Sequence, residues 1–447
     1  MNYKYKVILP TPSTFRRGMF SSLVFFSILL LYLSPKAQKV TLNYAPSSQL
    51  ATGNWARIVV NAPGIYKITY EEMQNMQLPV AGASSSFIRI HGYGGMLPEN
   101  AGTLRYDDLP EIAVKMFDGG DNNFGPGDYF LFWSPGPHTW KFNSQFSSFE
   151  SQNNIYTDHS SYFITIGNTP GLRISAATQP SSASQIVEYY DYHEIINPEL
   201  YNLIKSGRGW YGDLYDIVTQ RDYSFREATL RSGSEMKLRF SGVSRSSRGS
   251  VFILTINGQE HQLPFSAIST EPNTNYAFIS TKRFTQPAPS SFATASVKYN
   301  KLTGMDLGWL NFIEVNAEAR LKYDGQQLHF RKSGLSGAVE YRIEGGTAGM
   351  VLWDVTDPLN PQEVTGSVQG NSLSFKATSD TIKEYVLATN ANLLATSFAE
   401  KVTNQNLHGM QTPRMLIISP PEFMSEAVRL ATFHANRDDI SVSVVTP

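Results

Sequence analysis

The sequence predicts a mainly β protein, with β-sandwich or barrel-like domains followed by the first βαβ unit of an α/β domain. Short apolar or alternating runs recur between turns rich in Gly, Pro, Asn and Ser from residue 55 to residue 387. The composition is 41% hydrophobic and 12% aromatic, with 33 Gly and 24 Pro, which favours turn-rich β structure. The run at 415–418 differs, because it is continuously apolar and precedes a helical pattern.

The first 37 residues have the features of a secretory signal peptide. An apolar run, 19–33, follows a basic segment, and the small residue Ala37 suits cleavage before Gln38. A membrane anchor is the alternative, but the run is shorter than the roughly 18–20 apolar residues that span a bilayer. We therefore expect an exported protein.

Residues 38–175 are expected to form an N-terminal β-rich domain. Residues 55–70 predict two strands joined as a hairpin, because Pro63 fixes φ and Gly64 permits a positive φ in the turn. A short helix is expected directly after this pair. Further strands are predicted at 87–90, 129–133 and 162–166.

A Ser/Pro-rich segment, 176–185, has no periodicity and is interpreted as a linker. Residues 186–395 are expected to form a second β-sandwich-like domain. Asn257-Gly258 predicts a type I′ hairpin, and a second hairpin is predicted around Asp324-Gly325. The other strands expected here are 236–240, 296–299, 310–315, 337–343, 350–355, 372–375 and 384–387.

Residues 396–447 are interpreted as a linker and the truncated start of an α/β domain. A strand at 415–418, a helix at 422–435 and a strand at 440–445 would form one βαβ unit. A parallel sheet needs several strands and cover on both faces, so we expect this unit to open a larger domain.

Charge and cysteine content exclude several functions. Lys plus Arg number 37 against 38 Asp plus Glu, so nucleic acid is not an expected partner. The sequence contains no Cys, which excludes disulfides, thiolate zinc sites and a thiol nucleophile within these residues.

The motifs that could carry chemistry are weak. His193-Glu194-Ile195-Ile196-Asn197 lacks the second histidine of a zinc-binding helix, and the glycines at 91–95 do not have a nucleotide-binding spacing. The glycine-rich run Asp118 to Asp128 offers oxygen ligands for calcium, but tight turns use the same residues. We therefore assign no catalytic, cofactor-binding or metal-binding residue and expect no cofactor.

Aromatic and histidine residues are also interpreted structurally. Trp210, Trp309 and Trp353 could line a binding groove, but core packing is the favoured interpretation. His408 and His434 are expected to be structural or surface residues.

Four segments in a fixed order carry a family resemblance: GWLNFIEV at 308–315, WDVTDP at 353–358, NQNLHG at 404–409 and MLIISPPEF at 415–423. Together they resemble the PorU-type sortases of the type IX secretion system, which are gingipain-type cysteine peptidases. The resemblance implies that the tail opens a caspase-like α/β domain at the outer membrane or cell surface.

In that family the peptidase removes C-terminal sorting signals from secreted cargo and joins the cargo to anionic lipopolysaccharide. The resemblance thus implies cargo proteins and other secretion components as partners. The family's catalytic His and Cys lie beyond the first βαβ unit, so no position here takes their roles. A stand-alone exported β-sandwich module that binds a partner at the cell surface is the alternative.

Overall fold

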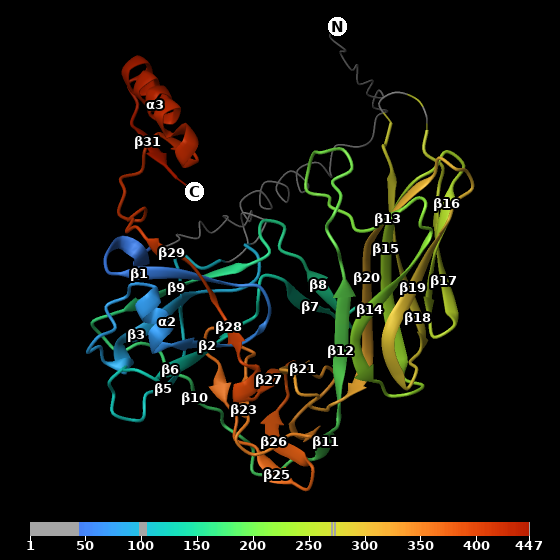
Figure 1. Ribbon diagram of the computed structural model, residues 1–447, viewed down its shortest axis with the longest axis horizontal. Helices are drawn as coiled ribbons and strands as arrows, with labels where there is room; N and C mark the ends of the chain where they lie inside the picture. The colour runs from blue at the N-terminus through green and yellow to red at the C-terminus, as the bar shows by residue number, and fades with distance from the viewer. Residues whose placement is uncertain (1–43, 98–104, 270, 272–273, 447) are drawn as a thin grey trace, which may run out of the picture. The chain divides into compact units, whose positions relative to one another are not determined.

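The computed structural model describes residues 44–97, 105–269, 271 and 274–446 (Figure 1). The predicted signal peptide, 1–37, lies outside these residues. From Pro46 onward the chain forms one compact unit. Its elements are almost all strands, so the predicted mainly β fold class is confirmed. Short 3-10 turns occur at η1 (Gln49–Ala51), η2 (Ser85–Phe87), η3 (Asn390–Asn392) and η4 (Pro421–Phe423).

The first sandwich is built from two sheets, antiparallel except for the parallel pair of β28 and β2, and one short helix. Alternate apolar residues of both sheets fill the core between them, and helix α2 (Tyr70–Asn75) adds Met73. Thr69 and Glu72 form a capping box that fixes the start of this helix. One sheet has the order β29 (Ser397–Val402), β1 (Trp55–Val60), β9 (Ser160–Ile166), β3 (Ile88–Gly92) and β4 (Glu111–Ile112). The other has the order β28 (Leu394–Ala395), β2 (Gly64–Thr69), β6 (Tyr129–Ser134) and β5 (Lys115–Phe117).

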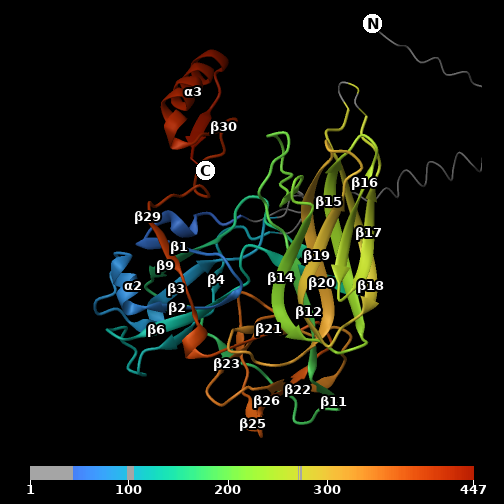
Figure 2. The same cartoon turned by 45° about the vertical axis from the view of Figure 1, so that its right-hand side comes forward.

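The second sandwich contains the longest strands. Figure 2 shows its two sheets lying face to face, and their inward side chains form one core from Tyr192 to Ala319. The first sheet has the order β12 (Tyr189–Ile196), β20 (Leu307–Arg320), β15 (Glu235–Arg245) and β18 (Phe278–Pro287), with β13 (Leu214–Tyr215) also on β20. The second has the order β14 (Gln220–Thr229), β19 (Ser291–Asn300), β16 (Ser250–Ile256) and β17 (Gln259–Phe265).

A third sandwich has its own core, centred on the packed rings of Phe330, Tyr341, Phe375 and Tyr385. Residues 186–395 therefore contribute to two separate cores. One sheet has the order β10 (Ser175–Ala176), β24 (Gln362–Glu363), β23 (Val351–Asp354), β27 (Glu384–Ala388) and β21 (Leu328–Arg331). The other has the order β11 (Gln185–Val187), β22 (Ala338–Glu344), β26 (Ser372–Thr378) and β25 (Ser367–Gln369).

A small fourth core joins the first and third sandwiches. Leu131 and Trp133 on β6 pack with Trp353 and Val386 from the third sandwich. Neighbouring Phe130 and Phe132 point into the first core. The continuously apolar run of β6 is explained by this burial on both faces.

Two predicted hairpins are wrong, and one is confirmed. β1 and β2 belong to different sheets, so the turn at Pro63 links the two layers of a sandwich. The chain around Asp324 also changes sheets, because β20 pairs with β15 whereas β21 pairs with β27. Asn257 and Gly258 both have positive φ, 49° and 76°, as a type I′ hairpin requires.

The tail forms the predicted βαβ unit. β30 (Met415–Ile418) pairs in parallel with β31 (Val442–Val445), and α3 (Met424–Asp438) connects them. Pro420 and Pro421 precede the helix, and Asp439 ends it in the left-handed region at φ 49°. Ala427 and Ala431 are the buried residues of α3.

Candidate functional site

The structure does not gather the residues that the sequence singled out into one site. His193 and Glu194 lie on strand β12, where successive side chains point to opposite faces. Trp309 and Trp353 are buried, as the core interpretation predicts, whereas Trp210 is exposed. Among the described residues, no group of three or more His, Cys, Asp and Glu side chains could hold a metal ion.

The loop from Asp118 to Asp128 uses its carboxylates to hold its own backbone. The Gly120 amide donates to Asp118 at 3.1 Å, and the Gly125 amide donates to Asp128 at 2.7 Å. The Ser85 hydroxyl also donates to Asp118, and this bond is the main cause of the lowered pKa of that carboxyl. These contacts are typical of Asx turns between strands.

The two histidines near the tail contact carboxylates without forming a larger cluster. His408 lies 3.8 Å from the carboxylates of both Asp107 and Asp108, and its amide donates to Ser48. His434 pairs with Asp438 one turn along α3, at 2.7 Å. The first set ties the segment after β29 to the beginning of the first sandwich.

A clamped hairpin joins the first and second sandwiches. β7 (Thr139–Asn143) and β8 (Ser148–Gln152) form this hairpin, which extends from β6. The Phe149 amide donates to Asn316 Oδ1 at 2.7 Å, and Asn316 Nδ2 donates back to the Phe149 carbonyl at 2.9 Å. The Ser151 amide donates to Glu314 Oε2 at 2.9 Å. The side chains of β20 therefore bind the hairpin as a neighbouring strand would.

A chain of ion pairs strengthens the clamp. Arg239 binds the buried carboxylate of Glu314 through two hydrogen bonds, of 3.0 and 2.6 Å. Arg283 binds Glu150 on the hairpin at 2.7 Å, and Arg239 lies 3.7 Å from the same carboxylate. Two-pronged arginine contacts of this kind fix orientation as well as charge.

Beside the hairpin lies a cavity of about 290 Å³, which we call the junction cavity. It is lined by segments that are far apart in the sequence, around residues 133–140, 190–194, 329–331 and 384. Such junctions between domains are common places for binding sites. No local motif marks these residues, so sequence reasoning missed the cavity.

His193 faces this cavity as a neutral ring. It lies between Trp140 and Phe149, with 4.6 Å between ring centroids in both cases. Its Nδ1 donates to the Asp191 carbonyl at 2.8 Å, which leaves Nε2 as an acceptor. Burial, with a contribution from the nearby Arg331 charge, lowers the pKa of His193 to about 3.

Glu384 is held between His329 and Arg331 on the same cavity wall. It contacts His329 Nε2, and it accepts a 2.8 Å hydrogen bond from Arg331. Burial alone would raise the pKa of Glu384, but His329 and Arg331 outweigh it and lower the pKa to about 2. Because this carboxylate is engaged and the His193 ring is enclosed, the cluster is suited to joining segments rather than to nucleophilic attack.

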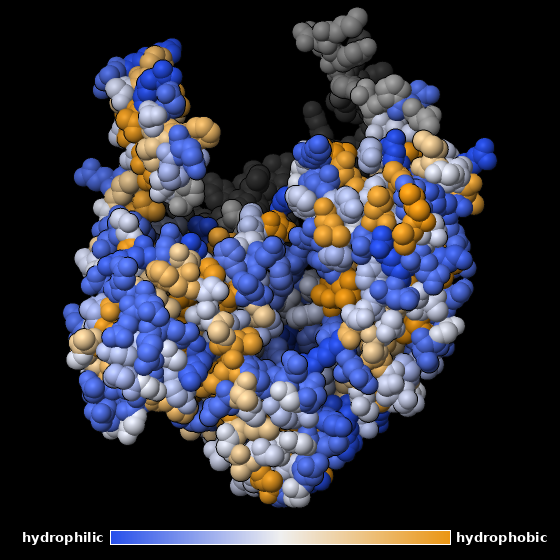
Figure 3. Space-filling model, in the orientation of Figure 1, coloured by the Kyte–Doolittle hydropathy of each residue, from blue (hydrophilic) through white to orange (hydrophobic). Residues whose placement is uncertain are grey.

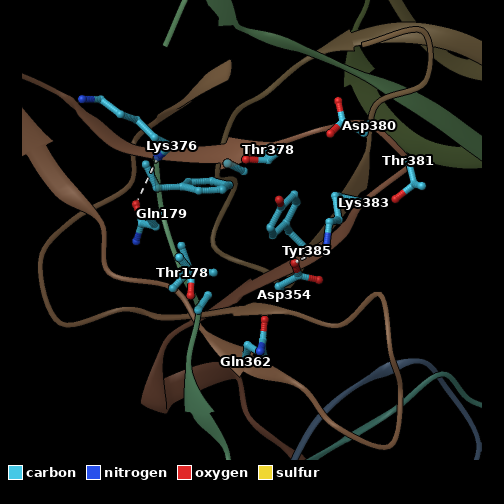
Figure 4. Close-up of a pocket in the computed structure, with 14 residues that line it drawn as sticks. Thr178, Gln179, Asp354, Gln362, Lys376, Thr378, Asp380, Thr381, Lys383 and Tyr385 are labelled. Atoms are coloured by element: carbon cyan, nitrogen blue, oxygen red, sulfur yellow. Dashed lines mark hydrogen bonds and ion pairs between the residues drawn. The ribbon is translucent and has the colours of Figure 1, made fainter. Parts of the chain in front are cut away.

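A second cavity, of about 300 Å³, lies on the third sandwich (Figure 4). Gln179 crosses its rim, accepting from the Lys376 amide at 3.2 Å and donating to the Thr365 carbonyl at 2.8 Å. On the opposite wall Lys383 pairs with Asp354 at 3.3 Å, beside the buried Tyr385. The segment predicted as a linker is thus bound along the sandwich surface at this point.

The βαβ unit exposes apolar side chains on both its sheet and its helix. Figure 3 shows these side chains on the surface of the α3 unit. The exposed residues are Leu416, Ile418, Phe423, Val428, Leu430 and Phe433. Apolar strand residues normally lie under covering helices in a parallel sheet. Among the helices of the described part of the chain, none is long and apolar enough to cross a bilayer.

Comparison with solved structures identifies one informative similarity. The crystal structure of dimeric latent PorU from Porphyromonas gingivalis superimposes with a TM-score of 0.76 over 90% of this chain, at 28% sequence identity. The chain is therefore related to PorU. The matched region is 38% of the PorU chain, so the present chain spans well under half the length of that protein.

The other structural matches are too weak to support an inference about fold or function. An infectious bursal disease virus structure and the tandem CBM22 domains of Paenibacillus barcinonensis Xyn10C have TM-scores of 0.15 and 0.19. These cover 90% and 60% of this chain, and 77% and 79% of their own chains, at 12% and 10% identity. No family model matches the sequence. No curated protein matches it either.

Proposed function

We propose that this chain is the N-terminal, pre-catalytic part of a type IX secretion sortase. In this proposal the whole protein is a gingipain-type cysteine peptidase that removes C-terminal sorting signals from secreted cargo at the outer membrane. The observation that carries the proposal is the match to PorU over 90% of this chain. The sandwiches would support the peptidase and present it to cargo and to other secretion components.

The surface of the βαβ unit supports the same proposal. Leu416 and Ile418 on β30 are 50% and 64% exposed, and Phe433 on α3 is 50% exposed. Large apolar side chains exposed together on one small unit mark a surface that contacts another protein segment. The peptidase segment of a PorU-type protein is the occupant that the proposal requires.

The test is complementation with that segment. Residues 38–447 would be expressed together with the peptidase portion of P. gingivalis PorU, and cleavage of a cargo bearing a C-terminal sorting signal would be measured. We expect the two pieces to co-purify and cleavage to require both. The double variant Leu416→Ser/Ile418→Ser should abolish co-purification, whereas the control Ile186→Ser, also 49% exposed, should not.

A second candidate function is a stand-alone exported β-sandwich module that binds a partner at the cell surface. The specific observation in its favour is that the sandwiches have cores of their own, filled from within residues 46–447. Cooperative unfolding of residues 38–447, together with protected amides in β30 and β31 and no association with the peptidase portion, would favour this candidate over the first.

A further inference from the structure

One end of the second sandwich exposes aliphatic side chains on two adjacent loops. The loop 216–219 carries Ile217 and Val218, which are 93% and 48% exposed. The loop 301–306 carries Leu302 and Met305, which are 64% and 86% exposed. We call these four side chains the apolar tip. Figure 3 shows apolar side chains exposed at this end of the sandwich, near β13.

The two loops are tied together by one lysine. Lys301 Nζ donates to the Asp216 carboxylate at 2.7 Å and to the Asp216 carbonyl at 3.3 Å. It also donates to the Gly304 carbonyl at 3.2 Å. Asp216 and the Gly304 carbonyl therefore face Lys301, whereas the four aliphatic side chains of the tip are exposed.

The loop 301–306 is also held rigid from within. The buried Asp306 carboxylate accepts from the Leu302 amide at 2.8 Å, and from the Thr303 amide and hydroxyl at 2.9 and 2.7 Å. Thr219 accepts from the Tyr299 amide at 2.8 Å, which ties the other loop to β19. Loops fixed in this way cannot fold their apolar side chains back onto the protein, so the exposure is built into the fold.

Two exposed cations lie at the same end of the sandwich as the apolar tip. Arg248 and Lys298 are exposed at this end of the sandwich, and neither has a carboxylate partner among the described residues. Of the nearby carboxylates, Asp213 and Asp216 are paired with Arg221 and Lys301, whereas Asp222 on β14 is exposed. Unpaired cations beside an apolar surface suit a target that is apolar inside and negatively charged at its border.

We propose that the apolar tip inserts into the surface of a lipid bilayer that carries anionic headgroups. A protein partner is less suited to this tip, because interface centres favour Trp, Tyr and Arg in well-packed pockets. The tip instead offers exposed Ile, Val, Leu and Met side chains. The proposal is independent of the sortase function, because it concerns the second sandwich alone.

Vesicle sedimentation tests the proposal on residues 38–447, which contain the whole compact unit. The probe is a set of vesicles of phosphatidylcholine, either pure or with one quarter phosphatidylglycerol. We expect binding to the anionic vesicles that weakens as salt rises. The double variant Ile217→Ser/Met305→Ser should bind about tenfold more weakly or worse, because both inserted side chains lose their apolar surface.

The matched control is Ile186→Ser/Val368→Ser on the third sandwich. These aliphatic side chains are 49% and 45% exposed on β11 and β25, away from the apolar tip. The control should bind vesicles as the unchanged protein does. Both double variants should keep the unfolding temperature of the unchanged protein, because the replaced side chains are exposed.

A spectroscopic readout is possible because the sequence contains no Cys. A dye whose emission depends on its environment would be attached to the Met305→Cys variant. Its emission should shift to shorter wavelength on anionic vesicles, whereas the emission of the same dye on the Val368→Cys variant should not. The proposal is overturned if the unchanged protein does not bind anionic vesicles, or if binding survives the Ile217 and Met305 changes. A concentration-dependent dimer that those changes abolish would instead make the tip an interface between two copies.

Discussion

Asn316 binds the backbone of Phe149 with both ends of its side-chain amide. Oδ1 accepts from the Phe149 amide at 2.7 Å, and Nδ2 donates to the Phe149 carbonyl at 2.9 Å. Both bonds are buried. One side chain on β20 thereby fixes the β7–β8 hairpin against the second sandwich.

Replacing Asn316 with Leu should lower the free energy of unfolding by about 2–3 kcal/mol, because the Phe149 amide and carbonyl would be left buried without partners. Denaturant unfolding measures the loss, and hydrogen exchange of the Phe149 amide should accelerate. The control is Asn311→Leu on the same strand, which removes one hydrogen bond to Ser241. If the Phe149 amide exchanged hydrogen at the same rate in both variants, Asn316 would not be the residue that holds the hairpin.

Glu314→Gln should be costly because it leaves the Arg239 guanidinium facing a neutral group. The Glu314 side chain is only 1% exposed, and loss of one partner from a buried ion pair costs roughly 3 kcal/mol or more. The exposed pair of Arg57 and Glu400 provides the comparison, and Glu400→Gln should change stability by less than about 1 kcal/mol. Thermal unfolding of both variants separates a buried structural pair from a surface contact.

Much of the β structure could be predicted because its signals are local. The Asn257-Gly258 turn and the strands at 415–418 and 442–445 follow from residue type and period alone. Strand pairing could not be predicted in the same way, and Pro63 shows why. A turn residue indicates that the chain reverses its direction. It does not indicate whether the next strand joins the same sheet or the facing sheet.

The junction cavity was beyond sequence reasoning for a related reason. Trp140, His193 and Glu384 come from three segments that are far apart in the sequence. No sequence motif surrounds any of them. Their significance depends on the hairpin lying against β12, a long-range contact that leaves no periodic signal. The Asp118–Asp128 loop is the opposite case. Its pattern of Asp, Asn and Gly is visible in the sequence, but in the structure its carboxylates accept hydrogen bonds from the amides of the loop itself.

Gly308 is predicted to be intolerant of a side chain. A methyl group there would lie 2.8 Å from Phe252 and 3.0 Å from Tyr299, both in the second core. Gly308→Ala should therefore destabilise the protein by about 1–3 kcal/mol. Gly304 is the matched control, because its added methyl would meet no atom within 4 Å and its φ is not positive. Similar melting temperatures for the two variants would refute the packing argument.

Acid should loosen the junction cavity in two steps, since two of its groups titrate below their ordinary pKa values. The folded pKa of His193 is about 3 against an ordinary 6.5. As pH falls, the His193 ring is therefore protonated in the unfolded chain before it is protonated in the folded protein. Stability is therefore lost as pH falls from about 6.5 toward 3. The folded pKa of Glu384 is about 2 against an ordinary 4.5. Stability is therefore also lost as pH falls from 4.5 toward 2, because protonated Glu384 no longer pairs with His329 and Arg331.

Urea midpoints measured at pH 7.5, 5.5 and 4.5 should fall in that order, and the His193→Phe variant should show a smaller change between pH 7.5 and 5.5. If the unchanged protein and His193→Phe show the same slope over that interval, the enclosed neutral ring is not the group responsible.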